Sequence, residues 1–372
     1  MVHQYINNGY HIVLDVNSGA IHVVDEVVYD VISLFEKHSS EEITGLLREK
    51  YSEEEIREAV EEVAQLKEEG SLFTPDTYEA PLIDFKKRPT VVKALCLHIA
   101  HDCNLACRYC FAEEGEYHGR RALMSYETGK AALDFLIANS GSRRNLEVDF
   151  FGGEPLMNFE VVKQLVAYGR EQEKLHDKHF RFTLTTNGVL LNDDIMEFAN
   201  REMDNVVLSI DGRKEVHDHM RPFRKGAGSY DLIVPKFQKF AKSRNQEKYY
   251  VRGTYTHFNT DFSKDVLHLA DLGFKQISVE PVVAEETDDY AIKEEDLPVL
   301  FKEYDDLAAE MVRRNKAGNG FNFFHFMIDL EGGPCVYKRL SGCGSGTSSA
   351  SSRIFIVSMD KEGELAQLIK PI

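Results

Sequence analysis

The sequence predicts an α/β protein built around a six-stranded parallel sheet, with a small α+β module ahead of it. Between residues 91 and 320, apolar strand-like runs alternate with helical patterns at regular intervals, which is typical of parallel sheets with right-handed crossovers. Residues 1–74 show short strand patterns and then three helical segments, and a polar, proline-bounded linker at 75–90 follows them. A chain of 372 residues is long enough for two or three domains.

Composition and charge narrow the functional class. A hydrophobic content of 43% and a charged content of 28% are ordinary for a soluble globular protein. The net charge of −18 opposes binding to nucleic-acid phosphates. No apolar run approaches the length of a membrane span, and the N-terminus lacks signal-peptide character. We therefore expect a cytoplasmic protein with no nucleic-acid or membrane partner, whose thiols are free to bind metal.

The N-terminal module, residues 1–74, has the order of a winged-helix-like domain. Asn8-Gly9 is a hairpin-turn sequence, Asp25 is a plausible helix N-cap, and Gly70 is a stop signal. The expected strands are 4–7, 11–15 and 20–24, and the expected helices are 25–37, 41–50 and 53–69. Alternative roles for such a module are capping, dimerisation or DNA binding, but its last helix is strongly acidic, which argues against DNA.

The core, residues 91–320, alternates strands with helices. The expected strands are 92–100, 146–151, 181–186, 205–210, 249–255 and 276–282, and the expected helices are 126–139, 159–176, 193–200, 230–243, 263–272 and 294–315. In such folds functional groups gather at the carboxyl ends of the strands. Cys96 alternates with apolar neighbours on the first strand, so we expect a core thiol there.

Cys103, Cys107 and Cys110 follow the first core strand at the spacing Cys-x3-Cys-x2-Cys. A structural zinc site needs four protein ligands, and no fourth cysteine lies nearby. Three thiolates can instead hold three irons of a [4Fe–4S] cluster, which leaves the fourth iron open to another ligand. The alternatives are a zinc site completed by His101 or His118, or three unrelated buried thiols.

Polar and glycine-rich segments follow the later strands. The second strand ends at Gly152-Gly153-Glu154-Pro155. The glycines allow a ligand to approach the backbone, and Glu154 can receive an ammonium group. The alternative is a simple strand-to-helix turn. Thr185 and Asn187 close the third strand, and Ser209 and Asp211 close the fourth; ordinary Asn-Gly and Asp-Gly turns are the alternative.

Arg221 begins a basic run that extends to Lys225; a guanidinium suits pairing through two hydrogen bonds, and a surface arginine is the alternative. Arg252 on the fifth strand is a weaker polar candidate, and Glu280 ends the sixth. His217 and His219 are spaced i, i+2 and do not share a helix face, so we propose no metal there.

The cysteine spacing, with the aromatic Tyr109 before the last cysteine, resembles the radical S-adenosylmethionine (SAM) superfamily, as does Gly-Gly-Glu-Pro. The resemblance implies a partial (β/α)6 barrel and a [4Fe–4S] cluster whose open iron chelates the amino and carboxylate groups of SAM. It also implies that an electron from the cluster cleaves SAM to a 5′-deoxyadenosyl radical, which abstracts hydrogen from substrate. The SAM-contacting residues it implies are Tyr109, Gly152, Gly153, Glu154, Thr185, Asn187, Ser209, Asp211 and Arg221, with Glu154 at the amino group and Arg221 at the carboxylate.

The N-terminal module resembles the RiPP recognition element, in which a leader peptide adds as a strand to the sheet edge beside the last helix. At the other end, Cys335 and Cys343 resemble the first two ligands of a SPASM or twitch extension, which holds auxiliary [4Fe–4S] clusters. We assign residues 321–347 to the start of that extension. The tail, 348–372, has none of its further cysteines. We therefore expect a shortened or out-of-frame version of a longer enzyme; alternatively the two cysteines bind metal in an oligomer or with a peptide Cys.

The whole pattern resembles the radical SAM maturases of six-cysteine (SCIFF) peptides. The resemblance implies an enzyme that forms Cys–Thr thioether crosslinks in a ribosomally made precursor peptide with a leader. It further implies a reductant such as flavodoxin or ferredoxin. The alternatives are another SPASM-type enzyme, such as an anaerobic sulfatase maturase, and a non-catalytic metal- or peptide-binding protein.

Overall fold

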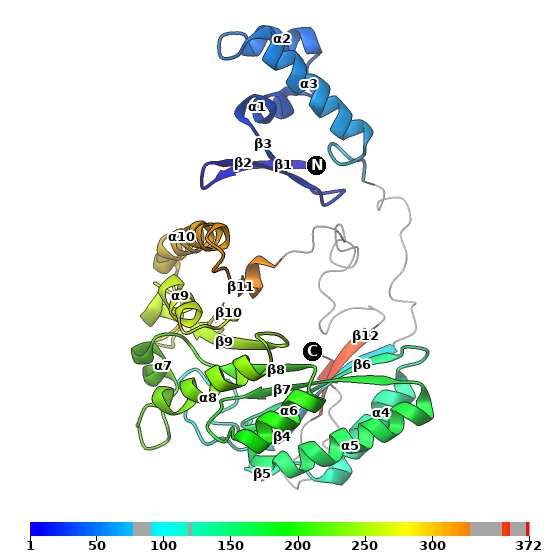
Figure 1. The fold of residues 1–372 in the computed structure, drawn as a ribbon, viewed down its shortest axis with the longest axis vertical. Coiled ribbons are helices and arrows are strands. Elements are labelled where there is room, and N and C mark those ends of the chain that lie inside the picture. Colours follow the sequence, from blue (N-terminus) through cyan, green and yellow to red (C-terminus); the bar gives the residue numbers. More distant parts are fainter. Residues whose placement is uncertain (77–90, 118–120, 328–351, 358–369, 372) are drawn as a thin grey trace. The chain divides into compact units, whose positions relative to one another are not determined.

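The computed structural model describes residues 1–76, 91–117, 121–327, 352–357 and 370–371 (Figure 1). The chain divides into two compact units, one holding residues 1–76 and the other holding the described residues from 91 onward. Within the described part, no helix combines the length and the apolar character needed to cross a bilayer. His118, Cys335, Cys343 and most of the predicted linker lie outside the described residues.

The first unit has the predicted order of three strands followed by three helices, with ends shifted by up to three residues. Its elements are β1 (Val2–Asn7), β2 (Tyr10–Asp15), β3 (Ile21–Val24), α1 (Glu26–Leu34), α2 (Ser40–Leu47) and α3 (Glu53–Glu68). The sheet is antiparallel in the order β1-β2-β3. Asn8 and Gly9 both have positive φ, 49° and 77°, which is the requirement of a two-residue hairpin turn. Asp25 caps α1 by accepting a hydrogen bond from the Val28 N–H.

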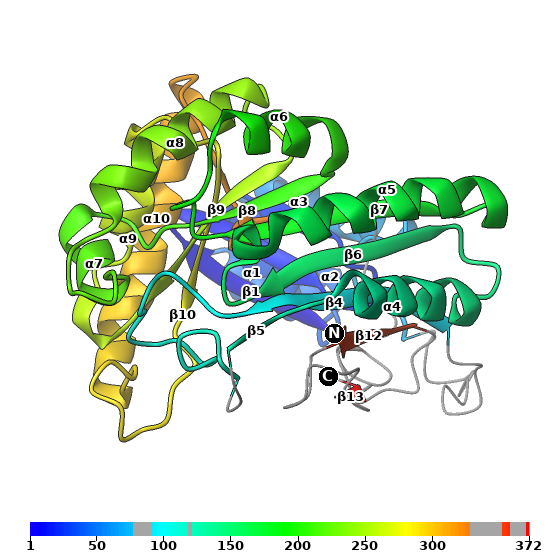
Figure 2. The same ribbon diagram turned by 90° about the horizontal axis from the view of Figure 1, so that it is seen from below.

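The second unit contains the predicted six-stranded parallel sheet, and its strands neighbour one another in sequence order. They are β4 (Val91–His101), β6 (Asn145–Gly152), β7 (His179–Thr186), β8 (Asn205–Ser209), β9 (Tyr249–Tyr255) and β10 (Gln276–Pro281). The helices are α4 (Tyr126–Asn139), α5 (Phe159–His176), α6 (Asp193–Glu202), α7 (Lys214–Met220), α8 (Tyr230–Ser243), α9 (Ser263–Asp271) and α10 (Leu297–Lys316). Figure 2 shows the strands in this order with helices packed along them. The mixed α/β fold with a partial (β/α)6 barrel is therefore confirmed.

The main hydrophobic core lies between this sheet and its helices. Val148 and Phe150 of β6 pack in one cluster with Leu133 of α4 and Leu165 of α5. Because strand side chains alternate, Asp149 of the same strand points to the other, concave face. The sheet therefore buries one face under helices and leaves the other for polar groups.

The sequence analysis did not predict five of the described strands and α-helices. Four of them are strands that pair with segments distant in the sequence, and the fifth is a short helix. They are β5 (Ala122–Leu123), β11 (Asn322–Phe323), β12 (Ser352–Val357), β13 (Lys370–Pro371) and α7. β11 extends the sheet in parallel beyond β10, past the boundary predicted at residue 320. β12 pairs in parallel with β4, within the tail for which no element was predicted. The apolar run at 354–357 is the only local signal for this strand.

Candidate active site

A cleft of about 400 Å³ opens at the carboxyl ends of the parallel strands. It is lined by Cys103, Cys107, Tyr109, Cys110, Phe111, Ala112, Gly115, Phe151, Gly152, Gly153, Pro155, Thr185, Thr186, Asn187, Ser209, Arg221, Arg252, Thr254, Glu280, Pro281, Val282 and Val283. The predicted site residues between 103 and 221 thus line a single cleft, except Glu154 and Asp211, which are fully buried beside it.

The cysteine loop leaves β4 and is fixed by the segment that follows α7. The Ala106 N–H donates to the Pro222 carbonyl, and the Arg108 N–H donates to the Met220 carbonyl, each at 2.9 Å. Leu105 forms an isolated antiparallel bridge with Phe223. These contacts fix the backbone conformation of the loop that carries the cysteines.

The three cysteines of the loop all line the cleft. Burial raises the pKa of Cys103 to about 12 and that of Cys107 to about 11, so each thiol needs a metal to become a thiolate at neutral pH. In the described part of the chain, no three His, Cys, Asp or Glu side chains converge on one point suited to a single ion. The ring of His101 packs against Tyr117, with the ring centroids 4.9 Å apart. The described residues therefore show no ready four-ligand zinc site, and three thiols are the ligand set that a [4Fe–4S] cluster with one open iron would need.

Gly152 and Gly153 are required because the cysteine loop lies against them. A Cβ at Gly153 would lie 2.1 Å from the Asp102 carbonyl oxygen, and one at Gly152 would lie 2.5 Å from that of Ala100. Gly152 also has a φ of +119°. The Gly153 N–H donates to the Ala100 carbonyl at 2.8 Å. The sequence analysis explained these glycines by the approach of a ligand, whereas the structure shows that backbone approaches them too.

Glu154 is fully buried, and its carboxylate bonds to the protein. One oxygen accepts from the Thr186 hydroxyl at 2.7 Å and from the Leu156 N–H at 3.0 Å. The other accepts from the Asn187 N–H at 2.8 Å. Burial raises the pKa of Glu154 to about 7, although these hydrogen bonds lower it. The side chain predicted to receive an ammonium group therefore holds the end of β7 in this structure.

Asp211 is a second fully buried carboxylate, and it gathers three donors. The Tyr109 hydroxyl lies 2.7 Å from both of its oxygens, the Arg221 Nε lies 3.0 Å from Oδ1, and the Thr254 N–H donates to Oδ1 at 3.1 Å. Burial raises the pKa of Tyr109 well above its ordinary value. Burial disfavours the charge of Arg221, but Asp211 raises the pKa of that guanidinium above its usual range. The cysteine loop, α7 and β9 therefore meet at one carboxylate.

A buried histidine binds the backbone of Asp211. His217 accepts the Asp211 N–H at its Nδ1, at 3.3 Å, and its Nε2 lies 2.9 Å from the Ser229 hydroxyl. Burial lowers the pKa of His217 to about 4, so the ring is neutral. On the outer side, His219 contacts Arg108 at 3.1 Å. The two histidines therefore have different partners: His217 contacts Asp211 and Ser229, and His219 contacts Arg108 of the cysteine loop.

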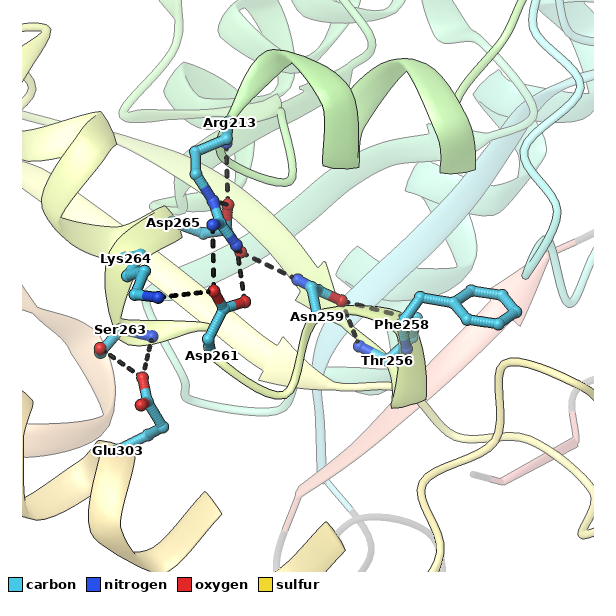
Figure 3. Close-up of polar contacts among 9 residues, drawn as sticks. All are labelled: Arg213, Thr256, Phe258, Asn259, Asp261, Ser263, Lys264, Asp265 and Glu303. Atoms are coloured by element: carbon cyan, nitrogen blue, oxygen red, sulfur yellow. Dashed lines mark hydrogen bonds and ion pairs between the residues drawn. The ribbon is translucent and has the colours of Figure 1, made fainter. Parts of the chain in front are cut away.

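A second polar network contacts the turn that follows β8, and the sequence analysis did not predict it (Figure 3). Arg213 donates to the fully buried Asp265 through Nε at 2.8 Å and through its backbone N–H at 2.9 Å, and it pairs with Asp261 at 2.7 Å. Asn259 donates to Asp265 at 3.0 Å. A Cβ at Gly212 would lie 2.3 Å from the Asp265 Cβ. Residues far apart in the chain make this network, so no local pattern signalled it.

The far wall of the cleft carries an ion pair. Arg252 of β9 donates to both carboxylate oxygens of Glu280 on β10, with one contact at 3.1 Å. The Ser278 hydroxyl also contacts Glu280, at 3.3 Å. Phe111 and Val283 line the same cleft and remain 71% and 95% exposed. The cleft is thus lined by the three cysteines, by the Arg252–Glu280 ion pair and by the exposed side chains of Phe111 and Val283, which we call its apolar mouth.

Comparisons with known proteins show partial similarity to several relatives. Residues 97–273 match the profile of the Radical SAM superfamily. An uncharacterized protein of Methanocaldococcus jannaschii is 31% identical over 50% of this chain and 62% of its own length. The radical SAM cyclopropyl synthase TigE of Paramaledivibacter caminithermalis is 23% identical over 46% and 38%. The cysteine-type anaerobic sulfatase-maturating enzyme of Clostridium novyi is 28% identical over 36% of each chain. The chain therefore spans less than two thirds of each of these relatives.

Two solved structures share the fold. Native anSMEcpe with bound AdoMet superposes with a TM-score of 0.60 at 20% identity, over 74% of this chain and 73% of that one. Streptococcus suis SuiB bound to precursor peptide SuiA superposes with a TM-score of 0.52 at 14% identity, over 95% of this chain and 80% of that one.

Proposed function

Because residues 97–273 form a radical SAM domain, we propose that this chain is a peptide maturase that forms Cys–Thr thioether crosslinks in a ribosomally made, Cys-rich precursor. Radical SAM domains use a [4Fe–4S] cluster and SAM. The observation that carries the proposal is the single cleft in which three cysteines, two glycines and an arginine meet at the carboxyl ends of the strands. The relatives support a maturase, and the thioether assignment goes beyond them.

The residues of the cleft suit both cofactors. Cys103, Cys107 and Cys110 would hold three irons of the cluster. The exposed backbone at 152–153, with Thr185, Ser209 and Arg221, would hold the polar groups of SAM. When bound, the two cofactors supply one-electron chemistry that removes hydrogen from a substrate carbon. Cys335 and Cys343, outside the described residues, are our candidates for an auxiliary cluster.

The protein's own contribution is to place the peptide and exclude water. The apolar mouth, with Phe111 and Val283, would cover the bound segment, and the Arg252–Glu280 pair offers a donor and an acceptor for peptide amides. In each crosslink a Thr carbon would lose one hydrogen atom, which ends in 5′-deoxyadenosine, and the Cys thiol would lose a proton to solvent. As the carbon–sulfur bond forms, the one remaining electron would return to an iron–sulfur cluster. We propose flavodoxin or ferredoxin as the source of electrons.

The first unit is our candidate for leader binding, as a RiPP recognition element. Among the described strands, β1 and β3 each pair only with β2, so both edges of the sheet can accept another strand. Val23 of β3 is 65% exposed, which leaves an apolar side chain at one edge. SuiB, which shares the fold over 95% of this chain, was solved bound to precursor peptide SuiA, and this supports a peptide partner for the chain.

Deletion of residues 1–74 is expected to abolish leader binding while SAM cleavage without peptide persists, because the cleft belongs entirely to the second unit. The measurement is isothermal titration with a short Cys-rich peptide encoded beside the gene, together with a 5′-deoxyadenosine assay. Unchanged peptide affinity would remove the recognition role from this module.

The proposed activity is tested by anaerobic incubation of the reconstituted full chain with SAM, dithionite and the same peptide. We expect 5′-deoxyadenosine and a peptide that has lost two hydrogens per crosslink. No 5′-deoxyadenosine from protein with an intact cluster would refute an enzymatic role, and a peptide that keeps its mass would refute the thioether step.

A second candidate is an anaerobic sulfatase maturase, because one relative carries that name. Turnover of a sulfatase-derived Cys peptide, without turnover of the neighbouring gene's peptide, would favour it.

A further inference from the structure

Two buried carboxylates lie beside the cleft: Glu154 accepts the backbone N–H of Asn187, and Asp211 accepts from the Arg221 side chain. A side-chain N–H of Asn187 and one of Arg221 each face a cysteine sulfur. We propose that these paired donors set the reduction potential of the cluster, and that the carboxylates are positioning residues for them. The inference rests on the proposed cluster. It differs from a role in SAM contact, because neither carboxylate lines the cleft.

The first arm runs from Glu154 through Asn187 to Cys103. Glu154 accepts the Asn187 N–H at 2.8 Å and so fixes the end of β7. The Asn187 Nδ2 then lies 3.6 Å from the Cys103 Sγ and 2.7 Å from the Asn104 Oδ1. The Leu105 N–H also faces the Cys103 Sγ, at 3.5 Å. Cys103 therefore sits against two N–H groups.

The second arm runs from Asp211 through Arg221 to Cys107. Asp211 accepts from the Arg221 Nε, and the Nη1 of the same guanidinium lies 3.9 Å from the Cys107 Sγ. The face of Tyr109 lies 5.4 Å from the guanidinium, and its hydroxyl is held by the same carboxylate. Arg221 is thus oriented by two groups before any ligand arrives.

N–H groups that face cysteine sulfurs stabilise the reduced form of the cluster more than the oxidised form. Reduction adds an electron whose charge spreads onto the sulfur ligands, and the potential depends on hydrogen bonds to those sulfurs and on nearby charge. The Arg221 side chain is only 13% exposed, so solvent screens its charge weakly. Removing either donor should therefore make the cluster harder to reduce.

The test is an EPR-monitored redox titration of the full chain, reconstituted anaerobically with iron and sulfide and measured without SAM. Arg221→Met is expected to lower the one-electron reduction equilibrium constant roughly tenfold, which is about 59 mV. Arg108→Met is the matched control: it removes the same charge from the cysteine loop, but at an exposed side chain. A shift in Arg221→Met no larger than in the control would overturn the proposal.

Asn187→Ala tests the other donor without a change in charge, and it should also lower the potential. If Arg221→Met does not retain iron, the reduction potential of Asn187→Ala becomes the deciding measurement. An unshifted potential in Asn187→Ala with full iron content would then refute the inference. Wild-type protein that binds no cluster would instead refute the proposed function. Because SAM is absent throughout, a role of Arg221 in holding the carboxylate of SAM cannot produce these shifts.

The positioning role of Asp211 is tested by a double-mutant cycle on the potential. If Asp211 acts through Arg221, the effect of Asp211→Asn should depend on whether Arg221 or Met occupies position 221. Equal effects in both backgrounds would show that the carboxylate acts only by its own charge, which would overturn its positioning role.

Discussion

Cys107→Ala is expected to leave the protein without a stable iron–sulfur cluster and without SAM cleavage. Cys107 supplies one of only three thiols on the loop, so its loss leaves two protein ligands for a cluster that already has an open iron. The measurement is iron and sulfide content after anaerobic reconstitution, followed by 5′-deoxyadenosine formation. The expected result is a fall of both to background.

Cys96→Ala is the matched control for this variant. Cys96 lies on β4, seven positions before Cys103, but it is outside the cleft lining, and burial raises the pKa of its thiol above the ordinary range. Its replacement should leave the iron content unchanged. Full iron content and SAM cleavage in Cys107→Ala would contradict the assignment of the loop as the cluster site.

Asp265→Ala is expected to lower the free energy of unfolding by about 3 kcal/mol, the lower end of the cost of breaking a buried ion pair. Asp265 is fully buried and is the main partner of Arg213, whose side chain is 24% exposed. Its loss would leave that guanidinium and the Asn259 amide without their buried acceptor. Because the same network holds the turn after β8, cluster retention should fall as well. Chemical denaturation gives the stability, and iron content gives the second effect.

Asp261→Ala supplies the comparison. Asp261 pairs with the same arginine, but its side chain is 35% exposed, so solvent replaces much of the lost interaction. We expect a loss of less than about 1 kcal/mol. Equal losses in the two variants would show that burial of Asp265 does not govern the strength of the network.

Sequence motifs located part of the candidate site, and tertiary contacts decided the rest. Cysteine spacing and the Gly-Gly-Glu-Pro segment identified the cysteines and the two glycines of the cleft lining, because each motif is contiguous in sequence. The bonding of Glu154 and Asp211 could not be read from the chain, since each carboxylate finds partners on other strands. Glu154 reaches Asn187, 33 residues away, and Asp211 reaches Tyr109, 102 residues away.

By itself, the sequence determined the local features of this protein. The hairpin turn at Asn8-Gly9, the cap at Asp25 and the alternation of strands and helices follow from backbone preferences and apolar periodicity, which act over a few residues. Only the tertiary structure decided which groups meet. It joined β12 to β4, paired Arg213 with Asp265, and brought Glu154 into hydrogen bonds with the end of β7 and Asp211 into hydrogen bonds with Tyr109 and Arg221. The physical reason is that a buried charge must find its partners wherever the packed chain brings them, regardless of their distance in sequence.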